Sequence, residues 1–379
     1  MARLLPESGA LNMAFDAHKL AVPGVRGLQP YVPGKPIEEL EREYGVTNVI
    51  KLASNESPLG ASPKALAAAQ AALSEMARYP DGGGFALKRA LAAKLGVSVN
   101  QITLGNGSSD ILEFAVRAFV AAQDEVIFSQ HAFALYPIVT QMIGARGVEV
   151  PARQWGHDLA AMQTAIGPRT RLVFIANPNN PTGTWLRSAE LKDFLESVPA
   201  HVLVVVDEAY FEYVEEHDYP STIEWLERYP NLVCARTFSK IYGLAGLRVG
   251  YGISSLGVAE ILNRVRPPFN VNHIAQAAAV AALADVTHLK KAQSVNAEGM
   301  AQLVKGFEKL GLPHIPSVGN FVCVELDDAA QVYEQLLRVG VIVRPVANYG
   351  MPKHLRVTVG LPEENERFLR GLEMVAGRK

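Results

Sequence analysis

Residues 232–240, Leu-Val-Cys-Ala-Arg-Thr-Phe-Ser-Lys, join a short apolar run to a hydroxyl-rich turn that ends on a lysine. Two similar apolar runs come earlier in the chain, Leu172–Ala176 and Val202–Val206. Each is followed at once by polar residues, Asn177–Gly183 and Asp207–Tyr210 respectively. Apolar runs of this length between helical stretches predict buried strands of a mostly parallel sheet. Ligands bind such sheets at the carboxyl ends of the strands, so the three polar segments are expected to converge.

The alternation of helix and strand extends over most of the chain. Helices are predicted at Pro63–Ala77, with Ser62 as N-cap, and at Gly84–Leu95. The predicted strands are Ile102–Leu104, Glu125–Phe128, Gly147–Val150, Arg171–Ala176, His201–Val206, Leu232–Ala235 and Val249–Ile253. This order predicts an α/β protein with a mostly parallel central sheet and helices on both faces.

The pattern changes at both ends of this region. Residues 1–50 are rich in proline and glycine and predict an extended arm with one short helix near Ile37–Tyr44, packing partly on the small domain or on a partner subunit. Residues 51–270 form the predicted large domain, and residues 271–379 a smaller α+β domain. The elements expected in the smaller domain are a long helical region from His273 to about Leu310, a strand at Asn320–Glu325, a helix at Ala329–Val339, strands at Val341–Arg344 and Leu355–Val359, and a final helix from Glu363.

The composition excludes several classes of protein. The 379 residues include 36 Lys and Arg and 38 Asp and Glu, a formal net charge of −2 that predicts neither a nucleic-acid nor a membrane partner. The apolar runs fall short of the ~20 residues of a membrane helix, and the N-terminus lacks a signal-peptide pattern, so a soluble, cytoplasmic protein is expected. Cys234 and Cys323 lie far apart in apolar runs and predict buried free thiols. No histidines or cysteines have metal-ligand spacing, so no metal is expected.

The polar segments suit one cofactor. A lysine on a turn can form a Schiff base with an aldehyde, and Lys240 lies on such a turn. Nearby Thr237, Ser239 and Arg248 can hold a phosphate through hydroxyl and charge-assisted hydrogen bonds. Asp207 can pair with a protonated ring nitrogen. Pyridoxal phosphate combines these groups and is the predicted cofactor.

Other residues complete this prediction. Asn180 and Tyr210 remain to donate hydrogen bonds to the phenolic oxygen of that cofactor. Gly107 with Ser108 and Ser109 opens an apolar helix after a predicted strand, and such a helix N-terminus binds anions. Taken singly, each feature has a plainer interpretation, because aspartates cap helices, Asn-Pro-Gly segments form turns and most lysines are solvated. Their joint occurrence at strand ends favours the cofactor site.

These motifs resemble those of the class I and II aminotransferases, pyridoxal-phosphate enzymes of fold type I. Further segments are similar to the histidinol-phosphate branch of that family. They are Leu52–Pro58, Tyr79–Asp81, Gly105–Ser109, Asn320-Phe321 and Arg356–Gly360. The resemblance covers nearly the whole chain from about Leu28. It implies a type I fold with a smaller C-terminal domain.

The resemblance implies a role for each site residue. Lys240 matches the Schiff-base lysine, Asp207 the partner of the ring nitrogen, and Asn180 and Tyr210 the contacts to the phenolic oxygen. The phosphate contacts are Gly107, Ser108, Ser109, Thr237, Ser239 and Arg248, with Tyr79 reaching in from a neighbouring subunit. Tyr79 therefore implies a homodimer with shared active sites. On the substrate side, Arg356 matches a carboxylate-binding arginine, and Arg344 and Tyr31 match positions that help hold the substrate's phosphate end. Asn55 is a further expected substrate-binding residue.

The chain departs from the family pattern in two places. His131-Ala132-Phe133 stands where Pro-Thr-Tyr is usual, so Phe133 would stack on the cofactor ring without a hydroxyl group. Asp81–Phe85 is richer in glycine than the family pattern. Both departures lie on the substrate side of the expected active site. A structural salt bridge with acidic residues of the small domain is the alternative role for Arg344 and Arg356.

The implied reaction is a ping-pong amino transfer from histidinol phosphate to 2-oxoglutarate, in which Lys240 moves the proton. Transamination of phenylalanine or tyrosine is the alternative within the family, and decarboxylation of an amino-acid phosphate is a further one. A regulatory binding module with the same fold is a different class of function. The absence of a basic helix-turn-helix pattern and the presence of Lys240 argue against it.

Overall fold

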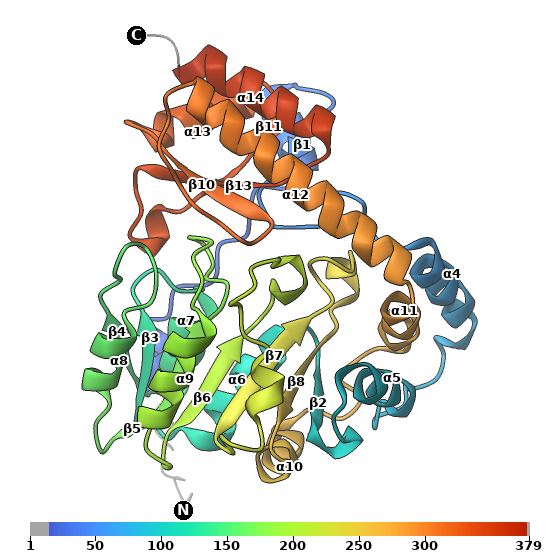
Figure 1. Cartoon of the computed structure of the whole chain (residues 1–379), viewed down its shortest axis with the longest axis vertical. Coiled ribbons are helices and arrows are strands. Elements are labelled where there is room, and N and C mark those ends of the chain that lie inside the picture. Colours follow the sequence, from blue (N-terminus) through green and yellow to red (C-terminus); the bar gives the residue numbers. More distant parts are fainter. Residues whose placement is uncertain (1–14, 377–379) are drawn as a thin grey trace, which may run out of the picture.

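A seven-stranded sheet carries the polar segments found in the sequence. The computed structural model describes residues 15–376 (Figure 1). The strand order is β2-β8-β7-β6-β5-β3-β4, and every neighbouring pair is parallel except those formed by β8. The strands are β2 (Ile102–Gly105), β3 (Glu125–Ser129), β4 (Arg146–Val150), β5 (Thr170–Ala176), β6 (Leu203–Asp207), β7 (Leu232–Thr237) and β8 (Gly250–Ser254). The predicted mostly parallel sheet is confirmed.

Helices cover both faces of this sheet, which explains the uninterrupted apolar strands. Alternate residues of β6 belong to two different cores, Val204 and Val206 on one face and Leu203 and Val205 on the other. The first face packs on α5 (Phe85–Leu95), α8 (Leu159–Ala165), α9 (Ser188–Ser197) and α11 (His273–Leu283). The second packs on α6 (Ser108–Phe119), α7 (Leu135–Met142) and α10 (Leu256–Val265). Outside these layers, α4 (Pro63–Ala72) lies against α11.

A smaller layer of sheet and helices lies over the carboxyl edge of the large sheet (Figure 1). Its antiparallel sheet has the order β12-β13-β10-β9. The elements are α12 (Val286–Lys309), β9 (His314–Ile315), β10 (Phe321–Glu325), α13 (Ala329–Arg338), β11 (Val341–Ile342), β12 (Arg344–Pro345), β13 (His354–Thr358) and α14 (Pro362–Ala376). Phe307 of α12 and Phe368 of α14 are fully buried in its core. The sheet and its helices form the α+β unit expected from the sequence.

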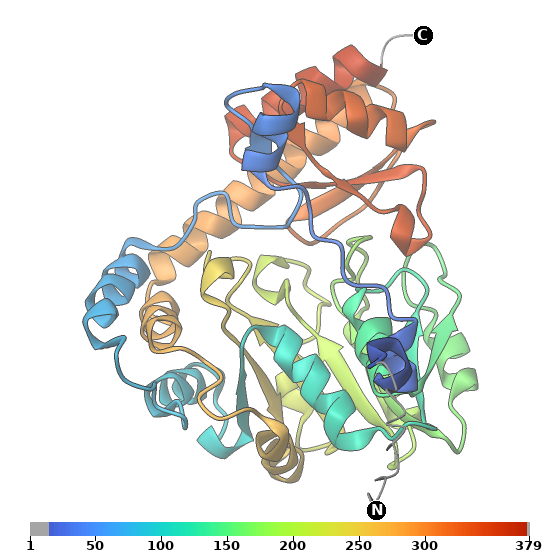
Figure 2. The same cartoon turned by 180° about the vertical axis from the view of Figure 1, so that it is seen from behind.

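The N-terminal segment contacts both layers. Figure 2 shows it running along the back of the molecule from beside the large sheet to the small layer. It contains α1 (Ala17–Leu20), α2 (Pro23–Arg26), α3 (Ile37–Tyr44) and β1 (Ile50–Lys51). The Tyr44 hydroxyl donates to Glu334 of α13 at 3.0 Å, and β1 pairs with β11 in parallel. The part of the predicted arm before residue 15 lies outside the described residues.

The division into arm, large and small domains stays a proposal. Two sets of contacts bear on its second boundary, predicted at residue 270. Helix α11 packs on α4 and α5 of the large layer, whereas Leu303 and Phe307 of α12 belong to the core of the small layer. We therefore propose that the boundary falls within α12.

Some elements differ in their limits from the predictions. The long helical region from His273 is broken after Leu283, because the side chain of Asp285 accepts from the His288 amide and begins a new helix. Short 3-10 helices lie at Leu73–Glu75, Val99–Gln101, Phe211–Tyr213, Thr222–Trp225, Ala245–Leu247 and Ala347–Tyr349. Cys234 and Cys323 are buried and unpaired, as predicted. None of the helices within residues 15–376 has the length and apolar character needed to cross a membrane.

Candidate active site

A cavity of about 200 Å³ lies between the carboxyl edge of the large sheet and the small layer. It brings together segments from β5, β6 and β7, the start of α6, and strands β12 and β13. Its lining is Tyr31, Gly34, Ala53, Ser54, Asn55, Ser108, Ser109, Phe133, Tyr136, Ala176, Pro178, Asn180, Asp207, Ala209, Tyr210, Thr237, Ser239, Lys240, Arg248, Arg344 and Arg356. Every candidate site residue from the sequence lines it except Gly107, which directly precedes the lining residue Ser108, and Tyr79.

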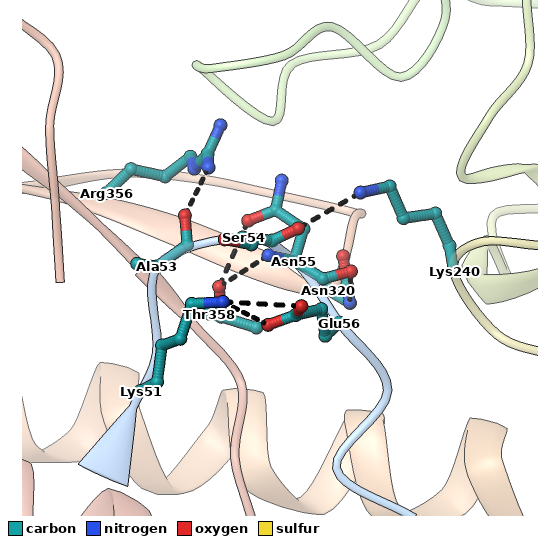
Figure 3. Close-up of polar contacts among 9 residues, drawn as sticks. All are labelled: Lys51, Ala53, Ser54, Asn55, Glu56, Lys240, Asn320, Arg356 and Thr358. Atoms are coloured by element: carbon teal, nitrogen blue, oxygen red, sulfur yellow. Dashed lines mark hydrogen bonds and ion pairs between the residues drawn. The ribbon is translucent and has the colours of Figure 1, made fainter. Parts of the chain in front are cut away.

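Lys240 projects into the cavity from the turn after β7. Its Nζ donates to the carbonyl oxygen of Ser54 at 3.1 Å (Figure 3). Burial, aided by the positive charges of Arg356 and Arg248, lowers the pKa of Lys240 to about 8. A lysine with this pKa is partly neutral near physiological pH, so it can act as a nucleophile or a base.

Asp207 ends β6 at the base of the cavity. Its Oδ2 accepts from the hydroxyl of Tyr136 at 3.0 Å, and its Oδ1 accepts from the amide of Ala209 at 3.2 Å. Burial raises the pKa of Asp207 to about 6, while the bond from Tyr136 opposes that rise. No helix in the described chain begins at Asp207, because the following 3-10 turn starts at Phe211. The carboxylate can therefore pair with a cationic group in the cavity.

The start of α6 and the turn after β7 form a cup at one end of the cavity. The N-cap residue of α6 is Gly107, which has no side chain to cap the helix, so in the described part of the chain the first amides of α6 are available to an anion. Gly107 precedes the helix with φ +90°, and a Cβ there would lie 2.5 Å from Nη2 of Arg248. Arg248 in turn donates to the hydroxyl of Ser239 at 3.3 Å, and Thr237 lies 3.0 Å from the same hydroxyl. Amides, hydroxyls and one guanidinium in this arrangement suit a phosphate.

Two buried arginines enter from the small layer. Arg344 and Arg356 are paired residues of the neighbouring strands β12 and β13. Arg356 donates to Asn180 Oδ1 at 2.5 Å and to the Ala53 carbonyl at 2.7 Å, while its Nε has no hydrogen-bond partner in the described part of the chain. Arg344 donates to the Val32 carbonyl at 2.7 Å. Neither forms an ion pair within residues 15–376, so the alternative of a structural salt bridge is not observed. Two buried cations without counter-charges favour an anionic ligand.

The aromatic candidates lie in different surroundings. Phe133 lines the cavity and packs edge-on against Tyr136, with 5.9 Å between ring centroids. Tyr31 of the N-terminal segment lines the cavity and is half-exposed, with its ring centroid 5.6 Å from the guanidinium carbon of Arg344. Tyr79 lies outside the cavity, is 83% exposed and stacks on Phe269 at 4.7 Å. Its predicted contact with the phosphate of another subunit stays a prediction.

Some contributors to the site were missed in the sequence. Tyr136 lies on α7, three residues after the candidate Phe133, and no spacing in the sequence points from it to Asp207. Ser54 contributes only its backbone carbonyl, which no side-chain pattern can reveal. Thr358 lies in a segment noted for its family resemblance, but it had no assigned role. Its hydroxyl accepts from the amide of Asn55 at 2.9 Å.

The cavity has the composition of a site for a phosphorylated aromatic aldehyde in an α/β fold of type I. This combination is found in the aminotransferases of classes I and II, and the chain belongs to that family, since residues 47–372 match the model of aminotransferase class I and II. It is 61% identical over 359 residues to histidinol-phosphate aminotransferase 1 of Nitrosococcus oceani, covering 94% of this chain and 97% of the relative. Identity to histidinol-phosphate aminotransferase 2 of Pseudomonas aeruginosa PAO1 is 60%, over 95% of this chain and 98% of the relative.

Solved structures agree with this assignment. Histidinol-phosphate aminotransferase of Sinorhizobium meliloti, in complex with pyridoxal-5'-phosphate, is 32% identical and superposes with a TM-score of 0.89. The match covers 96% of this chain and 99% of that chain. A double mutant of Thermus thermophilus aspartate aminotransferase is 24% identical with a TM-score of 0.80, covering 92% of this chain and 98% of that one. The similarity to the Thermus thermophilus enzyme shows the shared fold.

Proposed function

We propose that this chain transfers the amino group of histidinol phosphate to 2-oxoglutarate, with pyridoxal 5'-phosphate as cofactor, giving imidazole acetol phosphate and glutamate. The observation that carries the proposal is a buried lysine facing two buried arginines that have no counter-charge within the described chain. Histidinol phosphate presents a phosphate, and glutamate presents carboxylates. Arginine binds either anion through its planar fork, so one site can serve both substrates.

The residues present fit the cofactor. The helix start at Ser108 and Ser109, with the side chains of Thr237, Ser239 and Arg248, would hold its phosphate. Asp207 would accept from its ring nitrogen. Phe133 would pack on its ring face. Asn180 uses its Oδ1 for Arg356, which leaves its Nδ2 to donate to the phenolic oxygen beside Tyr210.

Lys240 is the proposed acid and base of the reaction. When bound, the cofactor supplies an aldehyde carbon that exchanges amino groups and a ring that withdraws electrons from the substrate carbon. The amine of Lys240, with a pKa of about 8, can take the proton from the carbon that bears the amino group of the donor. In the second half-reaction it can give a proton to the corresponding carbon of the oxo acid. The small layer over the cavity limits the access of water.

We also propose a homodimer that acts in the cytoplasm. Several large apolar side chains are exposed on one region of the surface, around α4, α5 and the turn before α11. They are Met76, Tyr79, Phe85 and Phe269. Exposed apolar groups in such number favour a subunit interface. This interface would present Tyr79 to the phosphate cup of the other subunit.

A half-reaction experiment tests the substrate. The purified protein is loaded with pyridoxal phosphate, and histidinol phosphate, glutamate and phenylalanine are added separately while the visible absorbance of the bound cofactor is followed. We expect rapid loss of that absorbance with histidinol phosphate and glutamate and slow loss with phenylalanine, with none in Lys240→Ala. A preference for phenylalanine would assign the aromatic branch, which the curated relatives do not favour. Release of carbon dioxide would indicate a decarboxylase.

A further inference from the structure

Every polar group of Asn55 has a partner, although the residue lies between the two layers. Its amide donates to Thr358 Oγ1 at 2.9 Å, and its carbonyl accepts from Asn320 Nδ2 at 3.0 Å (Figure 3). In the side chain, Oδ1 accepts from Thr358 Oγ1 at 3.1 Å, and Nδ2 donates to the hydroxyl of Tyr210 at 2.8 Å. Asn55 is 1% exposed. Both ends of its side-chain amide are therefore held by hydrogen bonds, Oδ1 to Thr358 and Nδ2 to Tyr210.

The hydroxyl of Thr358 determines the orientation of the side-chain amide of Asn55. The hydroxyl of Thr358 accepts from the Asn55 backbone, so its own hydrogen needs an acceptor. Within residues 15–376 that acceptor is Asn55 Oδ1. The reversed amide would place an NH₂ group against Thr358 and leave its buried hydroxyl without an acceptor, which is unfavourable. The Nδ2 end of Asn55 must then face Tyr210.

This orientation fixes the direction of the Tyr210 hydrogen bond. A hydroxyl that accepts from an amide keeps its own hydrogen for another partner. Tyr210 is buried on the large layer and lines the cavity. We propose that Asn55 is a positioning residue that keeps the Tyr210 hydroxyl as a hydrogen-bond donor into the cavity. The inference rests on the proposed function in one respect, because the acceptor would be the phenolic oxygen of pyridoxal phosphate.

The backbone of Asn55 explains why an asparagine suits this position. Its φ of +55° lies in the left-handed region, which asparagine and aspartate tolerate better than other residues with side chains. The neighbouring carbonyls of Ala53 and Ser54 accept from Arg356 and Lys240 (Figure 3). Thr358 and Asn320 belong to the small layer and Tyr210 to the large one. The donor direction at Tyr210 thus depends on contacts across the layers.

Asn55→Asp is the direct test, because aspartate keeps the shape and tolerates the same φ. A carboxylate only accepts hydrogen bonds, so the Tyr210 hydroxyl would turn away from the cavity and donate to it. The spectrum of the bound cofactor is titrated without amino donor, and its dissociation constant is measured. We expect the pH midpoint of the visible absorbance to rise by about one unit and cofactor binding to weaken roughly tenfold, as in Tyr210→Phe.

Two comparisons separate positioning from packing. Asn55→Ala leaves the Tyr210 hydrogen free, so its shift should be smaller than that of Asn55→Asp. A larger effect of Asn55→Ala would overturn the proposal, because loss of packing predicts that order. In the Tyr210→Phe background, Asn55→Asp should add no shift. A shift of equal size in that background would mean that the added charge acts directly, and would also overturn the proposal.

Thr358→Val provides a second route if Asn55→Asp does not fold, as judged by circular dichroism. It removes the hydroxyl that orients the amide while keeping the side-chain shape. We expect a smaller shift of the same sign that is absent in the Tyr210→Phe background, and no shift in Thr358→Val would contradict the proposal. These spectra need no amino donor, so failure of histidinol phosphate as a substrate would leave their interpretation unchanged.

Discussion

Glu208 and Arg236 form a buried ion pair directly behind the active-site cavity, with 2.7 Å between Oε2 and Nη2. Glu208 follows Asp207 at the end of β6, and Arg236 precedes Thr237 on β7. Successive side chains of a strand point to opposite faces, so the ion pair lies on the far side from the two cavity residues. Glu208 is 0% exposed and Arg236 is 3% exposed. The pair ties together the two strand ends that carry the proposed cofactor contacts.

We expect removal of one partner of this pair to destabilise the protein strongly. Glu208→Gln leaves the Arg236 charge buried without its counter-charge, which costs about 3–5 kcal/mol. Urea unfolding of the cofactor-free protein measures the loss. Glu260→Gln, which breaks an exposed pair with Arg264, is the matched control and should cost less than about 1 kcal/mol. Equal losses in the two variants would argue against the buried pair.

Tyr136→Phe should weaken cofactor binding most at low pH. The Tyr136 hydroxyl stabilises the ionised form of Asp207, whose pKa of about 6 is already raised by burial. Without that hydroxyl the pKa rises further, so more of the carboxyl group is protonated near pH 7 and cannot pair with a cationic ring. We expect the cofactor dissociation constant to increase roughly tenfold at pH 6.5 and much less at pH 8.5. Fluorescence titration at both pH values measures it, and a pH-independent loss would contradict this role.

Lys240→Met should stabilise the cofactor-free protein while abolishing turnover. The pKa of Lys240 falls from 10.5 to about 8 on folding, so the unfolded chain binds more protons between these values. Stability of the native protein should therefore rise with pH across this window. The methionine variant should lack that rise and should be more stable at pH 7 by roughly 1–3 kcal/mol. Urea unfolding from pH 7 to 10 tests this, and a less stable variant would show that the lysine is not strained by burial.

Arg356→Met should impair substrate binding but spare the cofactor. Loss of a charge-assisted fork to a carboxylate predicts a fall in kcat/KM for glutamate of about 10²–10³-fold. The cofactor dissociation constant should change little, because Arg356 takes no part in the proposed contacts to the cofactor's phosphate and ring nitrogen and reaches its phenolic oxygen only through Asn180. Steady-state kinetics and absorbance titration measure the two quantities. Arg370→Met, on the exposed face of α14, is the control and should leave both unchanged. Loss of the cofactor itself would refute the assigned role.

Mixing two inactive variants tests the shared active site. Lys240→Ala lacks the lysine, and Tyr79→Ala would lack the contribution to the neighbouring subunit. In a mixed dimer, the subunit with an intact Lys240 receives an intact Tyr79 from the other. We expect each variant alone to have low activity and the mixture, after subunit exchange, to recover up to one working site per dimer. If Tyr79→Ala alone has wild-type activity, Tyr79 does not serve the site.

The sequence predicted those parts of the fold and site that depend on local order along the chain. Asp207 and Lys240 were found because each follows an apolar strand, and strand ends meet at one edge of a parallel sheet. The two-sided burial of β6 followed from the apolar run Val202–Val206. The break before Asp285 was missed, because the alanine-rich sequence before it favours continuous helix and a single cap decides the boundary.

Contacts between distant segments could not be predicted in this way. Asn55 was expected to hold substrate, yet its side chain is occupied by Tyr210 and Thr358, which lie 155 and 303 positions away in the chain. Tyr136 reaches Asp207 only because α7 packs on the face of the sheet opposite α8 and α9. Neither relationship leaves a periodic pattern in the sequence. Both depend on how the layers come together.

Helix α12 has a mechanical consequence for the cavity. Its first half is tied to the large layer, where Gln293 donates to the Glu212 carbonyl at 2.7 Å, and its second half is embedded in the core of the small layer. Its 24 residues span roughly 36 Å, so it forms a long, continuous helical connection between the two layers. A tilt of about 5° at its first turn would displace its far end by about 3 Å. Small rotations near Asp285 would thus be amplified into changes in the distance between the two arginines and Lys240.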